Sequence, residues 1–323
     1  MSRPMLYITR LLPAPVMAAL RERYALVSEP VENQIPTGDD QRRGFAQADA
    51  VICTLADPIT DDLLAAAPRL KIVANYAVGY NNIDVAAATR RGTVVTNTPD
   101  VLTDATADLT WALILAVARR VVEGDQWARS GQWPGWAPTQ MLGTDVTGKT
   151  LGIIGMGRIG QAVALRAQGF RMPVIYASRR PCPAPPGVTT WTHRPLEEVL
   201  TQADFLSLHV PLSEATRHLI GSRELARMKS TAFLINTSRG PVIDEAALLA
   251  ALQQGTIAGA GLDVYEREPV ILSGLEQLSN VVLLPHLGSA TSDARIKMGM
   301  ICVENIAAVL GGRPPLNPVN RGT

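Results

Sequence analysis

The chain has 323 residues, a formal net charge of +1 at pH 7, and 47% hydrophobic and 18% charged residues. This length suits two domains of ordinary size, and the chain has neither a basic tail nor a Lys/Arg stripe interleaved with aromatic residues, so nucleic acid and membrane surfaces are not expected partners. The longest uninterrupted apolar run, residues 111–118, is far too short to span a bilayer, and we expect a soluble, cytoplasmic protein that acts on a small molecule.

Short apolar segments alternate with helical stretches in the first hundred residues. Such alternation predicts a parallel sheet covered by helices. The candidate strands are residues 6–9, 50–54, 71–75 and 92–97.

A long helix is predicted next, at residues 104–122, because apolar side chains recur there at helical spacing. Either Thr103 or Asp104 could be its N-cap. We expect this helix to lead from the first domain into a second.

A glycine motif follows an apolar strand at residues 151–154. A strand, a tight glycine turn and a helix start together present free N–H groups and a positive helix end to a pyrophosphate. A glycine motif alone is a weak signal, but a helical stretch at 161–168 and a second strand at 174–176 supply the expected context. The motif predicts a dinucleotide cofactor bound by Gly155, Met156, Gly157, Arg158, Ile159 and Gly160.

The end of the second strand indicates which dinucleotide it is. An acidic residue at this place would bind the ribose 2′-hydroxyl of NAD. The chain has Ser178, Arg179 and Arg180 instead. A hydroxyl and two guanidinium groups can bind a 2′-phosphate, so the predicted cofactor is NADP(H). The alternative is that both arginines are solvated charges beside the stiff, proline-rich loop at 181–187.

The remaining elements complete the predicted α/β fold. Four further strands are expected at 205–209, 232–236, 258–263 and 280–284, followed by a helix at 293–310 that returns to the first domain. The fold class is therefore two Rossmann-like or flavodoxin-like parallel-sheet domains, the second inserted into the first. The predicted substrate domain comprises residues 1–100 and 289–323, and the NADP-binding Rossmann domain comprises 101–288.

Three ionisable residues stand at the ends of predicted strands, where open parallel sheets build their sites. Arg239 could clamp a carboxylate, and His286 could carry a transferable proton near neutral pH. Glu268 is the third. For Arg239 and His286 the alternative is a structural role. The other histidines have no comparable setting: His193, His209 and His218.

These motifs resemble the D-isomer-specific 2-hydroxyacid dehydrogenase family, and within it the NADPH-dependent glyoxylate/hydroxypyruvate reductases. The resemblance covers essentially the whole chain. It implies hydride transfer that reduces glyoxylate or hydroxypyruvate to glycolate or D-glycerate. The matching segments are residues 155–160, 236–240, 260–269 and 285–291, with 131–136 and 141–143 similar to the reductase branch.

The resemblance implies a catalytic role for each of the three residues. Arg239 binds the substrate carboxylate and carbonyl oxygen, His286 donates the proton, and Glu268 stabilises the imidazolium. Glu266 is the competing carboxylate, and the residues alone give no physical reason to choose between them. Backbone N–H groups of the 75–79 loop assist substrate binding, so the implied substrate contacts also include Val78 and Gly79.

Cofactor contacts outside the glycine motif also follow from the resemblance. Asp263 is expected to contact the nicotinamide carboxamide, and a strand-end cap is the alternative. The further expected contacts are Thr106, Val210, Pro211, Thr237, Ser238 and Gly288.

The apolar helix at 104–122 and the tryptophan-bearing segment 127–136 predict a homodimer with both at its interface, because aromatic anchors are favoured there. The resemblance implies that Trp136 touches substrate in the partner subunit. No metal is expected. Cys53, Cys182 and Cys302 are scattered and form no CxxC pair.

Two alternatives remain open from the sequence. Reductases of longer 2-keto acids, such as 2-ketogluconate, share the core motifs. A non-catalytic protein that senses dinucleotides could share the fold and retain the same residues.

Overall fold

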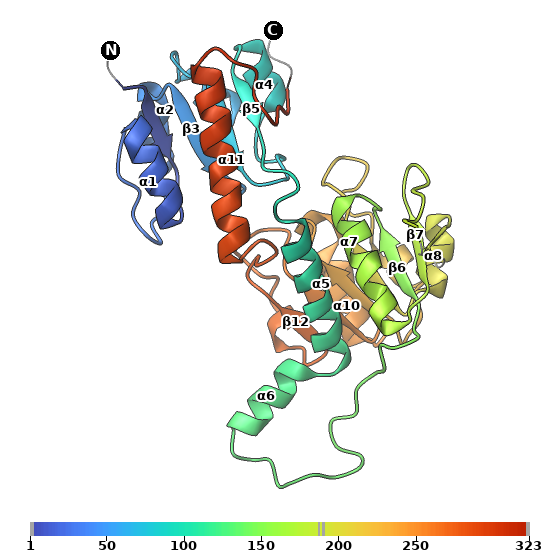
Figure 1. Cartoon of the computed structure of the whole chain (residues 1–323). Coiled ribbons are helices and arrows are strands. Elements are labelled where there is room, and N and C mark those ends of the chain that lie inside the picture. Colours follow the sequence, from blue (N-terminus) through green and yellow to red (C-terminus); the bar gives the residue numbers. More distant parts are fainter. Residues whose placement is uncertain (1–2, 187, 189–190, 321–323) are drawn as a thin grey trace. The chain divides into compact units, whose positions relative to one another are not determined.

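The computed structural model describes residues 3–186, 188 and 191–320. The chain divides into two compact units (Figure 1). The first contains the residues up to Leu102 and those from Ala290 onward, and the second is Thr103–Ser289. Each unit is built on a parallel sheet, so the predicted fold class is confirmed. Within the described residues, no helix is long and apolar enough to cross a membrane.

The first unit has a five-stranded sheet in the order β2-β1-β3-β4-β5, the flavodoxin-like order. All four pairings are parallel. The strands are β1 (Met5–Ile8), β2 (Ala25–Leu26), β3 (Ala50–Thr54), β4 (Ile72–Tyr76) and β5 (Val94–Thr96). The sequence located four of these strands and missed β2, which has only two residues and so shows no alternation.

Five helices belong to the described part of the first unit. The last of them returns from the far end of the chain, as predicted, and packs against β4 and α1. Gly299 permits that packing, because a Cβ there would come within 2.4 Å of Val16. The helices are α1 (Ala14–Arg23), α2 (Gly38–Gln47), α3 (Asp61–Ala65), α4 (Val85–Arg90) and α11 (Ser292–Leu310).

The second unit has a seven-stranded sheet in the order β12-β11-β10-β9-β6-β7-β8. The six strands from β8 to β11 follow the predicted Rossmann order, and β12 is a further strand at the edge beside β11. The strands are β6 (Leu151–Ile154), β7 (Val174–Ala177), β8 (Trp191–His193), β9 (Phe205–Leu208), β10 (Phe233–Asn236), β11 (Gly259–Leu262) and β12 (Val281–Leu283). The sequence missed β8, a three-residue edge strand that pairs with β7.

The helices of the second unit correct one prediction. They are α5 (Thr103–Ala118), α6 (Val121–Arg129), α7 (Arg158–Arg166), α8 (Leu196–Gln202), α9 (Ser222–Leu225) and α10 (Glu245–Gln253). The single helix predicted at 104–122 was wrong, because α5 ends at Ala118 and α6 starts after Arg120, whose φ of 52° is left-handed. The Ala118 carbonyl accepts the N–H of Thr144 at 2.8 Å, so a distant segment caps α5 there. Thr103 and Asp104 lie inside the first turn of α5 rather than before it.

Candidate active site

The glycine motif forms the turn between β6 and α7. A Cβ on Gly155 would lie 2.6 Å from the carbonyl oxygen of His209, and one on Gly160 would lie 2.2 Å from that of Gly155. Gly155 also has a left-handed φ of +98°. These two positions therefore require glycine for the backbone to pack.

The middle glycine is open instead. A Cβ on Gly157 would meet no atom within 4 Å, and Gly157 is the N-cap of α7 in an extended conformation. Arg158 and Ile159 begin the helix, while Met156 is buried below the turn. A helix N-terminus with an open glycine in front of it fits a pyrophosphate, so this turn can hold a dinucleotide.

The turn after β7 carries the two predicted phosphate-binding arginines, and both side chains are exposed. The Ser178 hydroxyl donates to the carbonyl of Arg180 at 2.5 Å, and His193 on β8 contacts the carbonyl of Ser178 at 3.0 Å. These bonds fix the backbone of the turn. The proline-rich loop that follows was predicted to end at Gly187, which lies outside the described residues.

His286 and Glu268 form a hydrogen-bonded pair. Nδ1 of His286 lies 2.8 Å from Oε2 of Glu268, and the side chains are 22% and 30% exposed, respectively. The other carboxylate oxygen, Oε1, accepts the N–H of Tyr265 at 3.1 Å. Burial opposes ionisation of Glu268, but the hydrogen bond and charge of His286, with smaller effects of the Tyr265 N–H and Arg239, lower its pKa. Glu268 is thus a carboxylate that orients the imidazole ring.

Arg239 follows β10 on a turn that its own neighbours hold. The Asn236 amide donates to the carbonyl of Arg239 at 2.9 Å, and Nη1 of Arg239 donates to the carbonyl of Ser238 at 2.7 Å. Burial lowers the pKa of Arg239, and the charge of Glu268 opposes this effect. A half-buried guanidinium beside a His–Glu pair can bind the carboxylate of a small acid.

Asp263 holds the turn that carries His286. Its side chain is 1% exposed, and its two oxygens accept the N–H groups of Leu287 at 2.6 Å and Gly288 at 2.8 Å. Thr106 on α5 donates its hydroxyl to the carbonyl of Gly288 at 2.9 Å. Burial raises the pKa of Asp263, while these N–H groups and His286 oppose the rise. The strand-end cap is therefore present, and a contact of Asp263 with nicotinamide stays a prediction.

The remaining predicted cofactor residues follow strands of the same sheet. Val210 and Pro211 follow β9, and Thr237 and Ser238 follow β10. The hydroxyl groups of Thr237 and Thr110 are 2.9 Å apart, so Thr237 ties β10 to α5.

The predicted substrate loop belongs to the first unit. Its carbonyl groups are held by neighbouring amides, because Asn97 donates its amide to Val78 and Asn75 donates to Gly79, both at 2.8 Å. Trp136, in the second unit, is 81% exposed.

The other histidines differ from His286. Burial lowers the pKa of His209 to about 3, so its ring is neutral near pH 7 and cannot serve as the acid. His218 is hydrogen-bonded to Glu266. Because Glu266 already has its own histidine, the geometry favours Glu268 as the partner of His286.

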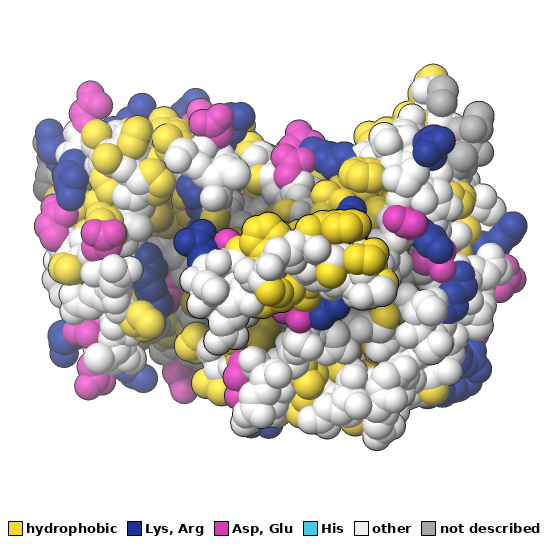
Figure 2. All heavy atoms as spheres, turned by 90° about the horizontal axis from the view of Figure 1, so that it is seen from below, with side chains coloured by type: hydrophobic (Ala, Val, Ile, Leu, Met, Phe, Trp, Pro, Cys, Tyr) yellow, Lys and Arg dark blue, Asp and Glu magenta, His cyan; other side chains and the backbone are white. Residues whose placement is uncertain are grey.

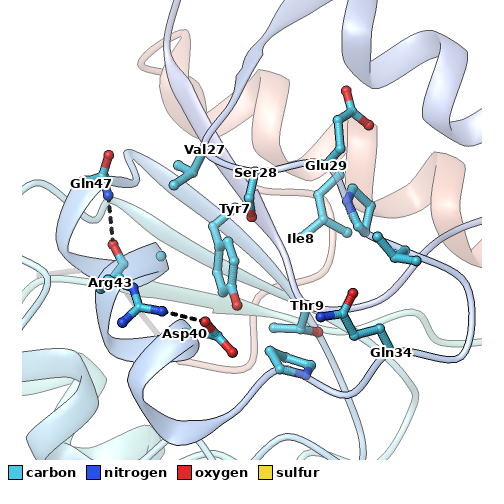
Figure 3. Close-up of a pocket in the computed structure, with 14 residues that line it drawn as sticks. Tyr7, Ile8, Thr9, Val27, Ser28, Glu29, Gln34, Asp40, Arg43 and Gln47 are labelled. Carbon is cyan, nitrogen blue, oxygen red and sulfur yellow. Dashed lines mark hydrogen bonds and ion pairs between the residues drawn. The ribbon is translucent and has the colours of Figure 1, made fainter.

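A separate cavity of about 350 Å³ lies in the first unit, between the end of β1, the 27–36 segment and α2 (Figure 3). Tyr7 reaches into it, and Arg43 and Asp40 form an ion pair of 2.6 Å at its edge. None of the predicted site residues lines it. The cavity is therefore distinct from the candidate active site.

Sequence reasoning missed two residues that shape the site, Glu245 and Tyr265. Glu245 accepts the N–H of Glu266 at 2.6 Å, and the Tyr265 hydroxyl donates to the carbonyl of Leu284 at 2.9 Å. In the sequence, Glu245 looks like an ordinary acid in a first helical turn. Its distant partner gives no signal there.

Comparisons with known proteins give a matching family model and several similar proteins. A family model described as "D-isomer specific 2-hydroxyacid dehydrogenase, NAD binding domain" matches residues 111–288. A protein of Thermococcus gammatolerans named glyoxylate reductase is 49% identical, with 99% of this chain and 96% of that protein covered. The solved structure of a Thermus thermophilus protein is 45% identical with a TM-score of 0.92, covering 98% of this chain and 100% of that chain. The solved structure of an NADPH-dependent glyoxylate/hydroxypyruvate reductase from Sinorhizobium meliloti, in complex with NADP and malonate, is 36% identical with a TM-score of 0.86. It covers 98% of this chain and 97% of that chain.

Proposed function

The chain belongs to the D-isomer specific 2-hydroxyacid dehydrogenase family, and we propose that it reduces glyoxylate and hydroxypyruvate to glycolate and D-glycerate with NADPH. The observation that carries this proposal is the His286–Glu268 pair beside the Arg239 turn, at the carboxyl ends of the strands of a dinucleotide-type sheet. The names of the T. gammatolerans and S. meliloti relatives support the choice of substrate.

The proposed mechanism assigns one task to each of the three residues. Arg239 binds the substrate carboxylate and polarises the carbonyl group, with help from backbone N–H groups of Val78 and Gly79. His286, as imidazolium, donates a proton to the carbonyl oxygen. Glu268 accepts the hydrogen bond of Nδ1 and thereby directs Nε2 of the same ring toward the substrate. The reduced nicotinamide, when bound, supplies the hydride.

The proposed NADPH preference rests on the turn after β7. It presents a hydroxyl and two exposed guanidinium groups and has no carboxylate at 178–180. One charge-assisted contact with a 2′-phosphate contributes about 1.5–3 kcal/mol. We therefore expect at least about tenfold higher catalytic efficiency with NADPH than with NADH. Steady-state kinetics with glyoxylate, hydroxypyruvate and 2-ketogluconate, each with both cofactors, measures this preference and identifies the substrate class.

Arg179→Asp tests the turn itself, because it places a carboxylate where the phosphate would bind. The preference should move toward NADH in this variant. Arg223→Asp on α9 has the same charge change at another exposed site and should leave the preference unchanged. Equal efficiency with both cofactors in the parent protein would contradict the assignment. Activity with 2-ketogluconate alone would favour a longer substrate, and no reduction of any keto acid would favour a sensing role.

We further propose that the protein is a homodimer that associates through α6 and the segment after it. Figure 2 views the molecule from the side where these elements lie in Figure 1, and hydrophobic side chains gather on that face. None of the α6 residues is buried. Trp133 and Trp136 are 52% and 81% exposed, and exposed aromatic side chains are typical of interfaces.

A dimer should therefore be the species seen by light scattering at micromolar concentration. Replacing both Trp133 and Trp136 with serine should raise the dissociation constant, because it removes two aromatic anchors. Leu316→Ser is a matched control, since Leu316 is 60% exposed but lies in the first unit. A monomeric parent protein would refute the proposal.

A further inference from the structure

Glu245 is a buried carboxylate that the proposed mechanism does not use. It is 5% exposed and is the first residue of α10. Asp244 already caps this helix by accepting the N–H of Ala247 at 3.1 Å, so Glu245 is not needed as a cap. Its Oε1 instead accepts the N–H of Glu266, 2.6 Å away on another loop. Because a buried carboxylate is costly, its placement here indicates a specific task.

The loop that Glu245 binds is the turn that carries Glu268. This turn lies directly against the connection that bears Arg239, since a Cβ on Gly240 would come within 1.8 Å of the Tyr265 carbonyl carbon. The Tyr265 hydroxyl donates to the carbonyl of Leu284, two residues before His286. Burial raises the pKa of Tyr265 to about 12, so the phenol keeps the proton that it donates. The turn is thus held on the Arg239 side and on the His286 side.

We propose that Glu245 is a positioning residue that, by binding the N–H of Glu266, fixes the 265–268 turn and sets Glu268 against Nδ1 of His286. This inference rests on the proposed function for its catalytic meaning. Without the hydrogen bond from the Glu266 N–H to Glu245, the backbone next to Glu268 is no longer fixed. The carboxylate of Glu268 is then held less precisely against Nδ1 of His286. A misplacement of about 1 Å in a catalytic group can cost about 100-fold in rate.

Charge and position must be separated in the test, because several ionisable groups lie nearby. Glu245 faces Glu266, Arg267 and Glu268, and His286 faces Glu268 and Asp263. Removing the negative charge of Glu245 would by itself slightly reduce the stability of the His286 imidazolium relative to the neutral ring. Glu245→Asp keeps the charge but withdraws the carboxylate by one methylene, whereas Glu245→Gln loses the charge but keeps an oxygen that can accept the N–H.

The first readout is the titration of His286 followed by NMR, which requires no substrate. The protein has four histidines, so His286→Ala identifies the signal. We expect Glu245→Asp to move the midpoint of this titration to lower pH, because Glu268 no longer holds the imidazolium. Glu245→Gln should move it less. The matched control is Glu224→Ala, because Glu224 also accepts a backbone N–H, that of Gly221, but at the start of α9.

The second readout is glyoxylate reduction. Glu245→Asp should lower kcat by about tenfold or more, with NADPH affinity measured by fluorescence unchanged, and Glu245→Gln should retain most of kcat. The proposal is overturned if Glu245→Asp leaves the His286 titration unmoved, or if Glu245→Gln is as damaging as Glu245→Asp. A parent protein that reduces no 2-keto acid would refute the proposed function instead, and the NMR titration would still decide the role of Glu245.

Discussion

Replacing His286 with alanine is expected to lower the turnover number for glyoxylate reduction by about 10² to 10⁴, the usual contribution of general acid catalysis. The loss should fall on kcat, because the ring that donates the proton is removed while the turn after β7 and the glycine turn stay intact. NADPH affinity, measured by fluorescence titration without substrate, should stay nearly unchanged. Turnover of the variant should also lose most of its dependence on pH near neutrality.

His218→Ala is the matched control for this experiment. His218 also pairs with a glutamate, Glu266, so its replacement removes a histidine–carboxylate pair of the same kind. His218 does not lie on the turn after β12 that carries His286. Its loss should therefore leave turnover near the parent level. If His218→Ala reduced kcat as much as His286→Ala, the proton donor would be misassigned. A rise in KM at constant kcat in His286→Ala would indicate a binding role instead.

Much of the fold could be predicted because its strands are buried on both faces. Strands such as β3 and β10 appear in the sequence as continuous apolar runs, which parallel sheets require. Two kinds of feature could not be predicted from the sequence. Short edge strands such as β2 and β8 have too few residues to show a pattern. The end of α5 depends on Thr144, whose N–H reaches the Ala118 carbonyl from a distant segment, and no local residue signals that bond.

The candidate site divides in the same way. Gly155 and Gly160 could be recognised because backbone packing allows no side chain there. The residues after β10, β11 and β12 could be placed near one another because the carboxyl ends of parallel strands share one edge of the sheet. The residues alone could not decide whether Glu266 or Glu268 faces His286, since the two are only two positions apart and the answer depends on how the turn folds. The contact that holds this turn comes from Glu245, which is distant in sequence.

Replacing Glu268 with glutamine is expected to move the pH dependence of reduction. Reduction requires the imidazolium form of His286, so its rate falls as rising pH removes the proton. The pKa of Glu268 is lowered, so its charge is present throughout that range and favours the imidazolium. The amide has no such charge, and the fall should shift to lower pH. Because the pair is partly exposed, solvent screens part of this interaction, and the direction of the displacement is the test.

The comparison with Glu266→Gln makes this experiment decisive. Glu266 is a carboxylate on the same turn, but its side chain binds His218, so its replacement should leave the reduction profile in place. Oxidation of glycolate supplies an independent check, because it needs neutral imidazole as the base. Its rate should rise with pH, and Glu268→Gln should shift this rise to lower pH as well. Both profiles must be measured where chemistry limits turnover, which a deuterium isotope effect on hydride transfer establishes. If Glu266→Gln displaced the profiles and Glu268→Gln did not, the carboxylate that stabilises the imidazolium would be Glu266.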